Sequence, residues 1–533
     1  MIQKLLVANR GEIALRVFRT CRELGIATVA VVAPDDSGSL HARAADETVE
    51  IASYLFSEEH IRAAKQTGAD AIHPGYGFLA ENADFAEAVN AAELVWIGPP
   101  PDALRAGGDK LEAKQIARAA GVPVVPTGDP DEIGFPLLVK AAAGGGGRGM
   151  RVVRSPGELE EALDAARREA KAAFGDDRVF CERYVERPHH VEVQLLGEVA
   201  LGERDCSIQR RHQKVLEEAP SPAVDETLRA AISDAAVAFA RAVGYENAGT
   251  AEFMVDGRDF YFLELNGRIQ VEHPVTELVT GLDLVKAQIR IASGEETPHG
   301  LSSRHGHAVE VRLYAEDPRT FFPQTGRITK LRLPSGIRVD AGVAEGDEIG
   351  IGYDPMIAKL IAHGTTRTDA LAALRAALDE TLVEGVTTNL PFLRWLVSHP
   401  AVRAGETTTA FLVEHPPLSR PPVRPAPAPW RRPFRLNLPA PAPAPPPDVA
   451  TATTDQGGAG GEQSTVVAPM PGTVIKLLVR AGDAVRARQP LVVLEAMKME
   501  TPLTSPYAAT VRAVHVAEGD RVSGGALLIE LDE

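Results

Sequence analysis

Residues 4–32 read KLLVANRGEIALRVFRTCRELGIATVAVV, and this stretch decides the fold of the first part of the chain. Residues 5–8 form an apolar run typical of a buried strand, residues 12–24 repeat apolar side chains with helical spacing, and residues 27–32 form a second apolar run. A strand, a helix and a strand joined by short turns predict parallel pairing in one sheet. We therefore expect a Rossmann-like α/β domain over residues 1–107.

Helical and strand patterns continue well beyond this first domain. A helix is predicted over 157–173, two strands within 251–265 and another helix over 368–382. The end of the chain consists of short β runs separated by Pro-Gly and Gly-Asp turns, which favours a small all-β domain. We expect an α/β multidomain protein whose further parts span residues 108–307, 308–415, 416–465 and 466–533.

The charge balance limits the possible partners. The 533 residues include 73 acidic and 56 basic side chains, which gives a formal net charge of −17. An acidic chain of this kind is a poor candidate for binding nucleic acid or an anionic membrane. The three cysteines are few and odd in number, which is typical of a reducing compartment. Because we find neither a signal-peptide pattern nor an apolar stretch of membrane-spanning length, we expect a cytoplasmic protein.

The segment 416–465 differs from the rest of the chain in composition. Twelve of its prolines lie between Pro421 and Pro447, where they are interleaved with alanine. Such a sequence is typical of a semi-rigid linker, and the Gly-, Thr- and Ser-rich residues after it are typical of a flexible one. The island WRRPFRLNL at 430–438 interrupts this linker, and its role is left open.

A glycine-rich segment, AAAGGGGRGM, follows Lys140. The backbone N–H groups of such a loop can surround phosphate oxygens, while Lys140 and Arg148 add positive charge. The loop is not a Walker A motif, because it has no Gly-Lys-Ser/Thr, and taken alone it is equally consistent with a plain flexible loop. The glycines that we expect at the phosphates are Gly144, Gly145, Gly146 and Gly147.

Two acidic residues lie on the two strands predicted within 251–265. Glu252 and Glu264 flank a tight Asp-Gly-Arg turn, so a hairpin can aim both at one point, and Asn266 follows. Carboxylates and an amide oxygen suit Mg²⁺ or Mn²⁺ beside ATP phosphates. A surface hairpin with solvated acids is the alternative, and the preceding glycine loop favours the metal site.

The C-terminal segment contains APMPG at 468–472 and EAMKME at 495–500. Residues 479–495 and 516–531 resemble each other, which indicates a small quasi-symmetric barrel. Taken alone, Lys498 could be a solvated lysine between core methionines, and lipoyl domains share this fold. The spacing of the two motifs resembles the biotinyl domain family, and the resemblance implies covalent attachment of biotin to Lys498.

The front of the chain resembles the ATP-grasp superfamily and, within it, the biotin carboxylase family over about residues 1–400. The resemblance implies biotin carboxylase N-terminal, ATP-grasp and C-terminal domains ahead of the linker and the biotinyl domain. The motifs that carry it are VANRGEIALRV (7–17), HPGYGFLAEN (73–82), GGGGRGMRVV (144–153), ERDCSIQRRHQKVLEEAP (203–220) and RIQVEHPVTE (268–277).

The resemblance also implies roles for individual residues. It implies contacts with ATP for Lys110, Lys140, Glu182, His190, Gln209 and His212. It implies metal ligation for Glu252, Glu264 and Asn266. It implies contacts with bicarbonate or biotin for Tyr76, Lys214, Arg268, Gln270, Val271, Glu272 and Arg338.

The spacing of Arg268, Gln270 and Glu272 supports this division of roles. In an extended segment, a period of two places the three polar side chains on one face. Cations there can hold bicarbonate, and Glu272 can remove its proton. A strand with one solvated face would show the same pattern. We expect Cys206 to be a packed structural thiol and not a base.

The implied reaction converts ATP, bicarbonate and biotinyl-Lys498 into ADP, phosphate and carboxybiotin through carboxyphosphate. Catalysis is assigned to Glu272, Arg338, Lys214 and Arg268, with Arg338 stabilising the charge on biotin's ureido oxygen. The implied partners are a biotin protein ligase and a carboxyltransferase β subunit for acetyl-, propionyl- or methylcrotonyl-CoA. The carboxylase part is expected to be a homodimer within a larger hetero-oligomer.

Two departures from the family pattern qualify this reading. Gly267 stands where Thr, Ser or Pro is common, and we expect added backbone freedom there. The folded domain that docks the β subunit in many α subunits is missing from 416–465.

Three alternatives stay open. Another ATP-grasp ligase is disfavoured by the biotinyl domain. A non-catalytic biotin carrier or scaffold is disfavoured by intact Lys214, Glu272 and Arg338. A pyruvate carboxylase component would need a partner with a pyruvate site.

Overall fold

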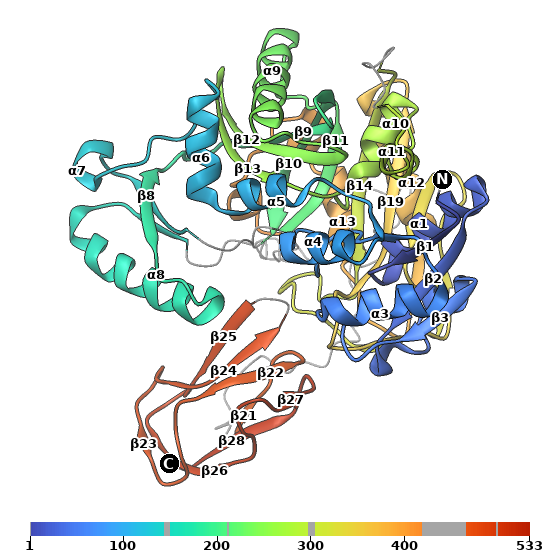
Figure 1. The fold of residues 1–533 in the computed structure, drawn as a ribbon. Coiled ribbons are helices and arrows are strands. Elements are labelled where there is room, and N and C mark those ends of the chain that lie inside the picture. The colour runs from blue at the N-terminus through green and yellow to red at the C-terminus, as the bar shows by residue number, and fades with distance from the viewer. Residues whose placement is uncertain are drawn as a thin grey trace, which may run out of the picture.

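The computed structural model describes residues 2–142, 150–210, 213–296, 304–417, 465–496 and 499–532 (Figure 1). Several predicted features lie outside these described residues: the four glycines at 144–147, His212, the island at 430–438 and Lys498. Within the described part, no helix combines the length and apolar character needed to cross a membrane.

The N-terminal sheet has five parallel strands in the order β3-β2-β1-β4-β5. β1 (Lys4–Val7) and β2 (Ala27–Val32) pair in parallel and are joined by α1 (Gly11–Leu24), which confirms the prediction from residues 4–32. Gly25 ends α1 with a φ of 71°, a left-handed conformation that favours glycine. The remaining strands are β3 (Glu47–Glu50), β4 (Ala71–His73) and β5 (Val95–Trp96).

A small antiparallel sheet with one helix, which we call the lid, carries Lys140 and Glu182. Its strands lie in the order β7-β6-β8 and are β6 (Leu137–Ala141), β7 (Arg151–Val153) and β8 (Val179–Arg183). The helix predicted over 157–173 is α8 (Leu159–Phe174), and its Leu163 and Ala166 pack on the sheet. Figure 1 shows this unit, with α8 and β8, projecting to one side.

The largest sheet has eight strands in the order β13-β12-β9-β10-β11-β14-β19-β17. The two strands predicted within 251–265 are the hairpin of β12 (Ala248–Asp256) and β13 (Asp259–Asn266). The sheet is continuous across residue 307, because β11 pairs with β14. Its other strands are β9 (His189–Leu196), β10 (Val199–Arg210), β11 (Gln213–Ala219), β14 (His307–Tyr314), β17 (Arg338–Ala341) and β19 (Met356–Gly364).

Helix α10 (His273–Thr280) covers one face of this sheet. Its Val275 and Val279 pack in one core with Ala219, Ala308 and Ile361, which belong to β11, β14 and β19. Three strands therefore hold the helix, and its N-terminus is fixed over the middle of the sheet.

The helix predicted over 368–382 is α12 (Arg367–Glu380). It begins with a capping box, in which the Thr366 and Asp369 side chains each accept a hydrogen bond from the other residue's backbone N–H. Its Leu371, Leu374 and Leu378 enter the core beneath β14 and β19.

The remaining elements lie around these sheets. The helices are α2 (Leu40–Ala44), α3 (Ser57–Thr67), α4 (Ala83–Ala91), α5 (Pro101–Gly108), α6 (Lys110–Ala119), α7 (Pro130–Ile133), α9 (Glu226–Ala242), α11 (Leu284–Ala292), α13 (Leu390–Ser398), α14 (Pro400–Ala404) and α15 (Phe411–Glu414). The strands are β15 (Gly326–Arg327), β16 (Lys330–Arg332), β18 (Glu348–Ile349) and β20 (Leu382–Glu384).

The C-terminal domain is all-β, as predicted. Its two four-stranded sheets have the orders β21-β28-β26-β23 and β25-β24-β22-β27. The repeat in the sequence corresponds to the pairs β23–β24 and β27–β28, each of which has one strand in each sheet, so the predicted quasi-symmetry is confirmed. The strands are β21 (Thr465–Val467), β22 (Gly472–Leu477), β23 (Ala484–Val485), β24 (Pro490–Ala496), β25 (Met499–Thr504), β26 (Ala509–Val514), β27 (Arg521–Val522) and β28 (Leu527–Asp532).

Candidate active site

Lys214 on β11 lies at the centre of a cluster of buried acids. Its Nζ is 2.7 Å from Glu252 Oε1 on β12 and 2.7 Å from Glu272 Oε1 at the N-terminus of α10. It also contacts Glu192 on β9. One ammonium group therefore joins acids from two neighbouring strands, β9 and β12, and from the N-terminus of α10.

Glu252 and Glu264 are paired across the β12–β13 hairpin, as the sequence predicted. The Glu252 side chain is 7% exposed and that of Glu264 is 33% exposed, so the pair leads from the buried cluster towards solvent. Asn266 Nδ2 donates to Glu252 Oε1 at 2.9 Å, and His190 Nε2 lies 2.9 Å from Glu252 Oε2. Two carboxylates and an amide are hard oxygen donors of the kind that Mg²⁺ prefers. These three residues fit a divalent ion, which would neutralise phosphate charge when bound.

The segment from Arg268 to Glu272 is not the extended run that its alternation predicted. It is a loop, and α10 starts directly after Glu272. Gln270 Nε2 donates to Glu252 Oε1 at 2.9 Å, whereas Arg268 Nε lies 3.0 Å from Glu81 Oε2. The predicted extended backbone is therefore wrong, because the helix N-terminus redirects the chain. The polar side chains still reach one cluster, since Arg268 Nη2 donates to Asn266 Oδ1 at 2.9 Å.

Arg204 on β10 contacts the cluster around Lys214 through Glu192, and it was not among the predicted site residues. It is fully buried, and it contacts Glu192. It also donates to Gln194 Oε1 at 2.7 Å, to Thr276 Oγ1 at 2.9 Å and to Gln270 Oε1 at 2.8 Å. Its guanidinium therefore ties two strands to the loop that holds Gln270.

Arg338 on β17 lies in a second cluster beside the same helix. Its Nη1 is 2.7 Å from Glu277 Oε2 and its Nη2 is 2.7 Å from Asp340 Oδ2. Glu277 also accepts from Arg16 Nη2 at 2.8 Å. Because Glu272 and Glu277 belong to the N-cap and body of one short helix, α10 links this cluster to the one around Lys214.

Tyr76 and Val271 are both connected to Lys359, Val271 directly and Tyr76 through Glu12. The Tyr76 hydroxyl donates to Glu12, whose Oε1 lies 3.2 Å from Lys359 Nζ. Lys359 Nζ donates to the Val271 carbonyl at 2.8 Å. Tyr76 is thus linked to Val271 through Glu12 and Lys359, and it has no direct contact with Arg338 among the described residues.

The residues predicted to hold ATP fall in two places. Lys140 Nζ lies 2.5 Å from Glu182 Oε1 on the lid, while Lys110 Nζ lies 3.5 Å from Glu264 Oε2 near the hairpin. Gln209 lies opposite Lys214 in the β10–β11 pair. Lys114, which the sequence argument missed, also contacts Glu182, and burial lowers its pKa to about 8.

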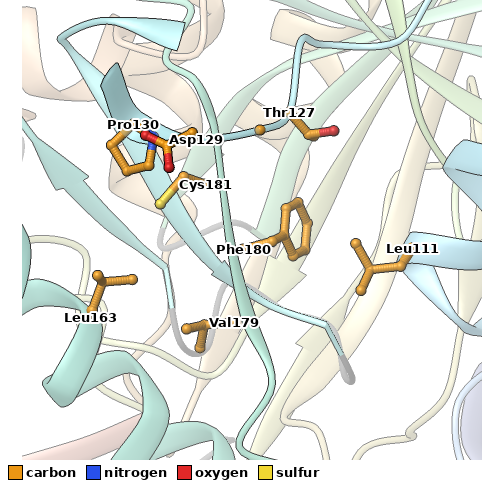
Figure 2. A pocket seen from close by; sticks show the side chains of 9 residues that line it. Leu111, Thr127, Asp129, Pro130, Leu163, Val179, Phe180 and Cys181 are labelled. Atoms are coloured by element: carbon orange, nitrogen blue, oxygen red, sulfur yellow. The ribbon is translucent and has the colours of Figure 1, made fainter. Parts of the chain in front are cut away.

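The lid also bounds a hollow of about 460 Å³ between α6, β8 and α8 (Figure 2). Leu111, Leu163, Val179 and Phe180 make its described lining largely apolar, and Asp129 is the one charged residue there. A hollow with this lining offers no cation to a phosphate.

The charges around Glu272 determine its protonation. Burial raises its pKa, but the positive charges of Lys214, Arg312 and Arg204 outweigh burial and hold this pKa well below its usual range. Cys206 is fully buried, and burial raises its pKa well above normal. The thiol is therefore protonated, as expected for a packed structural cysteine.

Other charged residues that the sequence argument missed come from strands. They alternate with apolar residues, as in HHVEVQLL and HAVEVRLY, and such a pattern normally indicates a solvated face. Here that face is covered by α10, so the charges are buried. The missed members are Glu192, Arg312 and Lys359.

Comparison with known proteins assigns these regions to families. Residues 1–104 match the biotin carboxylase N-terminal domain, 109–299 the carbamoyl-phosphate synthase L chain ATP-binding domain, 310–414 the biotin carboxylase C-terminal domain and 464–531 the biotin-requiring enzyme domain. The biotin carboxylase of Halalkalibacterium halodurans is 48% identical over 443 residues, which cover 78% of this chain and 98% of the relative.

The chain belongs to the biotin carboxylase family. It is an ATP-dependent carboxylase with a biotin-requiring domain. The propionyl-CoA carboxylase alpha chain of Ruegeria pomeroyi is 48% identical over 466 residues, covering 78% of this chain and 68% of the relative.

The fold comparison agrees with this assignment. The biotin carboxylase domain dimer of the Hydrogenobacter thermophilus 2-oxoglutarate carboxylase, solved with MgADP, ADP and bicarbonate, matches with a TM-score of 0.76 and 43% identity. The match covers 78% of this chain and 98% of that one.

Proposed function

We propose that this chain carboxylates biotin on its own Lys498 and delivers the carboxyl group to a carboxyltransferase on another polypeptide. The observation that carries the proposal is the cluster in which Lys214 Nζ lies 2.7 Å from both Glu252 and Glu272. A base, a cation and a metal-binding acid converge there, which is the set that bicarbonate activation by ATP requires.

In this proposal Glu272 removes the proton of bicarbonate, whose oxygen then attacks the γ-phosphorus of ATP in line. Lys214, which is 2.7 Å from Glu272, would stabilise the developing charge, and Glu252, Glu264 and Asn266 would hold a divalent ion that neutralises phosphate charge. The carboxyphosphate that forms breaks into CO₂ and phosphate. Phosphate takes the N1 proton of biotin, and CO₂ forms the new N–C bond.

We assign Arg338 to biotin's ureido oxygen. It lies in a cluster of its own beside α10, where Glu277 and Asp340 hold its guanidinium on two sides at 2.7 Å. A cation fixed in this way stabilises the negative charge that develops on the ureido oxygen. We further propose homodimeric association of the carboxylase part, because the Hydrogenobacter relative is described as a dimer.

We propose an acyl-CoA as the final acceptor, by analogy with the propionyl-CoA carboxylase alpha chain of Ruegeria pomeroyi. The partner would be a carboxyltransferase β subunit, and a biotin protein ligase would load Lys498. Copurification of the partner, followed by carboxylation assays with a panel of acyl-CoAs and pyruvate, tests this part. Activity with pyruvate alone would contradict it.

The core reaction is tested by bicarbonate-dependent ATP hydrolysis with the biotinylated full chain. We expect hydrolysis to require Mg²⁺ and carboxylated biotin to accumulate. Lys498→Arg should abolish labelling of the chain by ¹⁴C-bicarbonate, while free biotin should still be carboxylated. A wild-type chain that carries biotin and shows no bicarbonate-dependent ATP hydrolysis would refute the proposal and favour a non-catalytic carrier.

A further inference from the structure

Two glutamates beneath the first turn of α10 have no part in the reaction described above. Glu217 on β11 and Glu310 on β14 are direct cross-strand partners. Both side chains have 0% exposure. Neither carboxylate oxygen of Glu310 has a hydrogen bond within the described part of the chain, and the one close polar contact of Glu217 there is with Arg312. Because directly opposite residues in an antiparallel pair have Cβ atoms about 5 Å apart, the two carboxyl groups are neighbours.

The surroundings differ between the two acids. Arg312 Nη2 lies 2.6 Å from Glu217 Oε1 as an ion pair, whereas Glu310 has no ion pair among the described residues. Two buried carboxylates at this spacing do not both ionise. Burial, opposed in part by Lys359, raises the pKa of Glu310 well above its usual range. Glu310 therefore keeps its proton, and Glu217 carries the charge when one is present.

Arg312 joins this pair to the proposed base. The same Nη2 atom lies 2.6 Å from Glu217 Oε1 and 2.9 Å from Glu272 Oε2. When Glu272 takes a proton from bicarbonate it becomes neutral, and a buried guanidinium without a counter-ion is unfavourable. Glu217 keeps Arg312 paired in that state, so protonation of Glu272 costs less.

On the basis of the proposed role of Glu272, we infer that Glu217 is a positioning residue that acts as the second counter-ion of Arg312 and makes Glu272 a stronger base. Glu310 is its proton-holding neighbour. The other charged or titratable groups that face this pair come from β10, β11, β19 and the α10 N-cap. They are Cys206, Lys214, Lys359 and Glu272.

The pH dependence of the rate tests this role. Burial is the main reason that the pKa of Glu217 is raised to about 7. If ionised Glu217 is the active form, the rate of biotin carboxylation rises as pH increases through about 7. Glu217→Gln in the full biotinylated chain should remove this rise and lower kcat roughly tenfold, with the KM for ATP unchanged. The bicarbonate concentration is held constant across the pH range.

Three further variants make the result specific. Glu217→Asp keeps the charge and should retain the rise, and Glu310→Gln keeps a neutral donor and should retain it too. Glu218→Gln is the matched control, because Glu218 is the next residue on β11 and instead pairs with Arg367 and His307. It removes a buried acid from the same strand and should leave the pH profile unchanged.

A Glu217→Gln chain with wild-type kcat and an unchanged rise overturns the inference. Loss of the rise in Glu310→Gln also overturns it, since Glu310 would then be the ionising group, and this measurement decides the matter if Glu217→Gln does not fold. Failure of the proposed function looks different. In that case the wild-type chain itself would hydrolyse no ATP in response to bicarbonate.

Discussion

At the scale of the residue, Arg338 is proposed to act in the transfer of CO₂ to biotin and not in the phosphorylation of bicarbonate. Its guanidinium contacts Glu277 and Asp340, and within the described residues it has no contact with Lys214 or Glu272. Arg338→Gln should therefore lower the rate of biotin carboxylation by roughly 10²–10³, while bicarbonate-dependent ATP hydrolysis falls much less. Parallel assays of phosphate release and ¹⁴C fixation measure this split.

The control for this prediction is Arg332→Gln, which changes an exposed arginine on β16. Both activities should stay at the wild-type level in that variant. Equal loss of both activities in Arg338→Gln would show that Arg338 acts in the phosphoryl-transfer half as well.

The sequence predicted the site residues that are close together along the chain, but not those that only the arrangement of the strands and α10 brings together. Glu252 and Glu264 are linked by a tight turn, so the hairpin alone fixes them as neighbours. Lys214 reaches Glu252 only because β10 and β9 lie between their strands in a particular order. Glu217 and Arg312 look like residues of a solvated face until α10 is known to cover them. Local spacing thus predicted the hairpin site, and strand order determined the rest.

At the scale of the element, Gly267 lies close to helix α5. A Cβ at this position would lie 2.6 Å from Leu104 Cδ2, so α5 occupies the space that a side chain would need. A side chain at this position would require the buried Leu104 side chain to move. Gly267→Ser should destabilise the chain by about 1–3 kcal/mol.

A double-mutant cycle with Leu104→Ala tests this explanation. Removing the Leu104 side chain makes room for the serine, so the two substitutions together should cost less than the sum of the single effects. Thermal or urea unfolding of the four proteins measures the coupling. Strict additivity would show that Leu104 is not the obstacle.

The N-terminal sheet and its helices should be sensitive to acid. His60 and His73 are fully buried, and burial lowers both pKa values, that of His73 to about 4. The Gly75 N–H donates to His73 Nδ1 at 3.0 Å, which requires that nitrogen to be unprotonated. With unfolded pKa values near ~6.5, the stability from each neutral ring is complete above that pH. For His73 it is lost by up to about 1.4 kcal/mol per pH unit as pH falls towards 4, and His60 contributes in the same direction.

Melting temperatures at pH 7.5 and pH 5.0 check this expectation. The wild-type chain should melt at a lower temperature at pH 5.0, and His60→Gln should show a smaller difference between the two conditions. A melting temperature that is the same at both pH values would contradict the assignment of neutral buried rings.

At the scale of the whole molecule, we expect the length of residues 416–465 to limit how often biotin on Lys498 meets the proposed active site. A flexible chain of about 50 residues spans roughly 35–40 Å on average, whereas about 10 residues span roughly 17 Å. Shortening 416–465 to ten residues should lower carboxylation of the chain's own biotin at least about tenfold. Free biotin should be carboxylated at the wild-type rate, since the catalytic clusters are unchanged.

A Gly/Ser replacement of equal length is the matched control and should keep most of the activity. Single-turnover labelling of the chain at several protein concentrations distinguishes the two routes. If shortening leaves the rate unchanged at low concentration, biotin does not need the length of this tether.

The continuous eight-stranded sheet limits how this enzyme can be rebuilt from pieces. A chimera that takes residues 308–415 from a relative would replace β14 and keep β11. The two hydrogen-bonded strands would then come from different proteins. Across these two strands Glu217 meets Glu310, and Arg312 reaches back to Glu272. The two parts of the carboxylase on either side of residue 307 are therefore expected to work only when both come from the same parent protein.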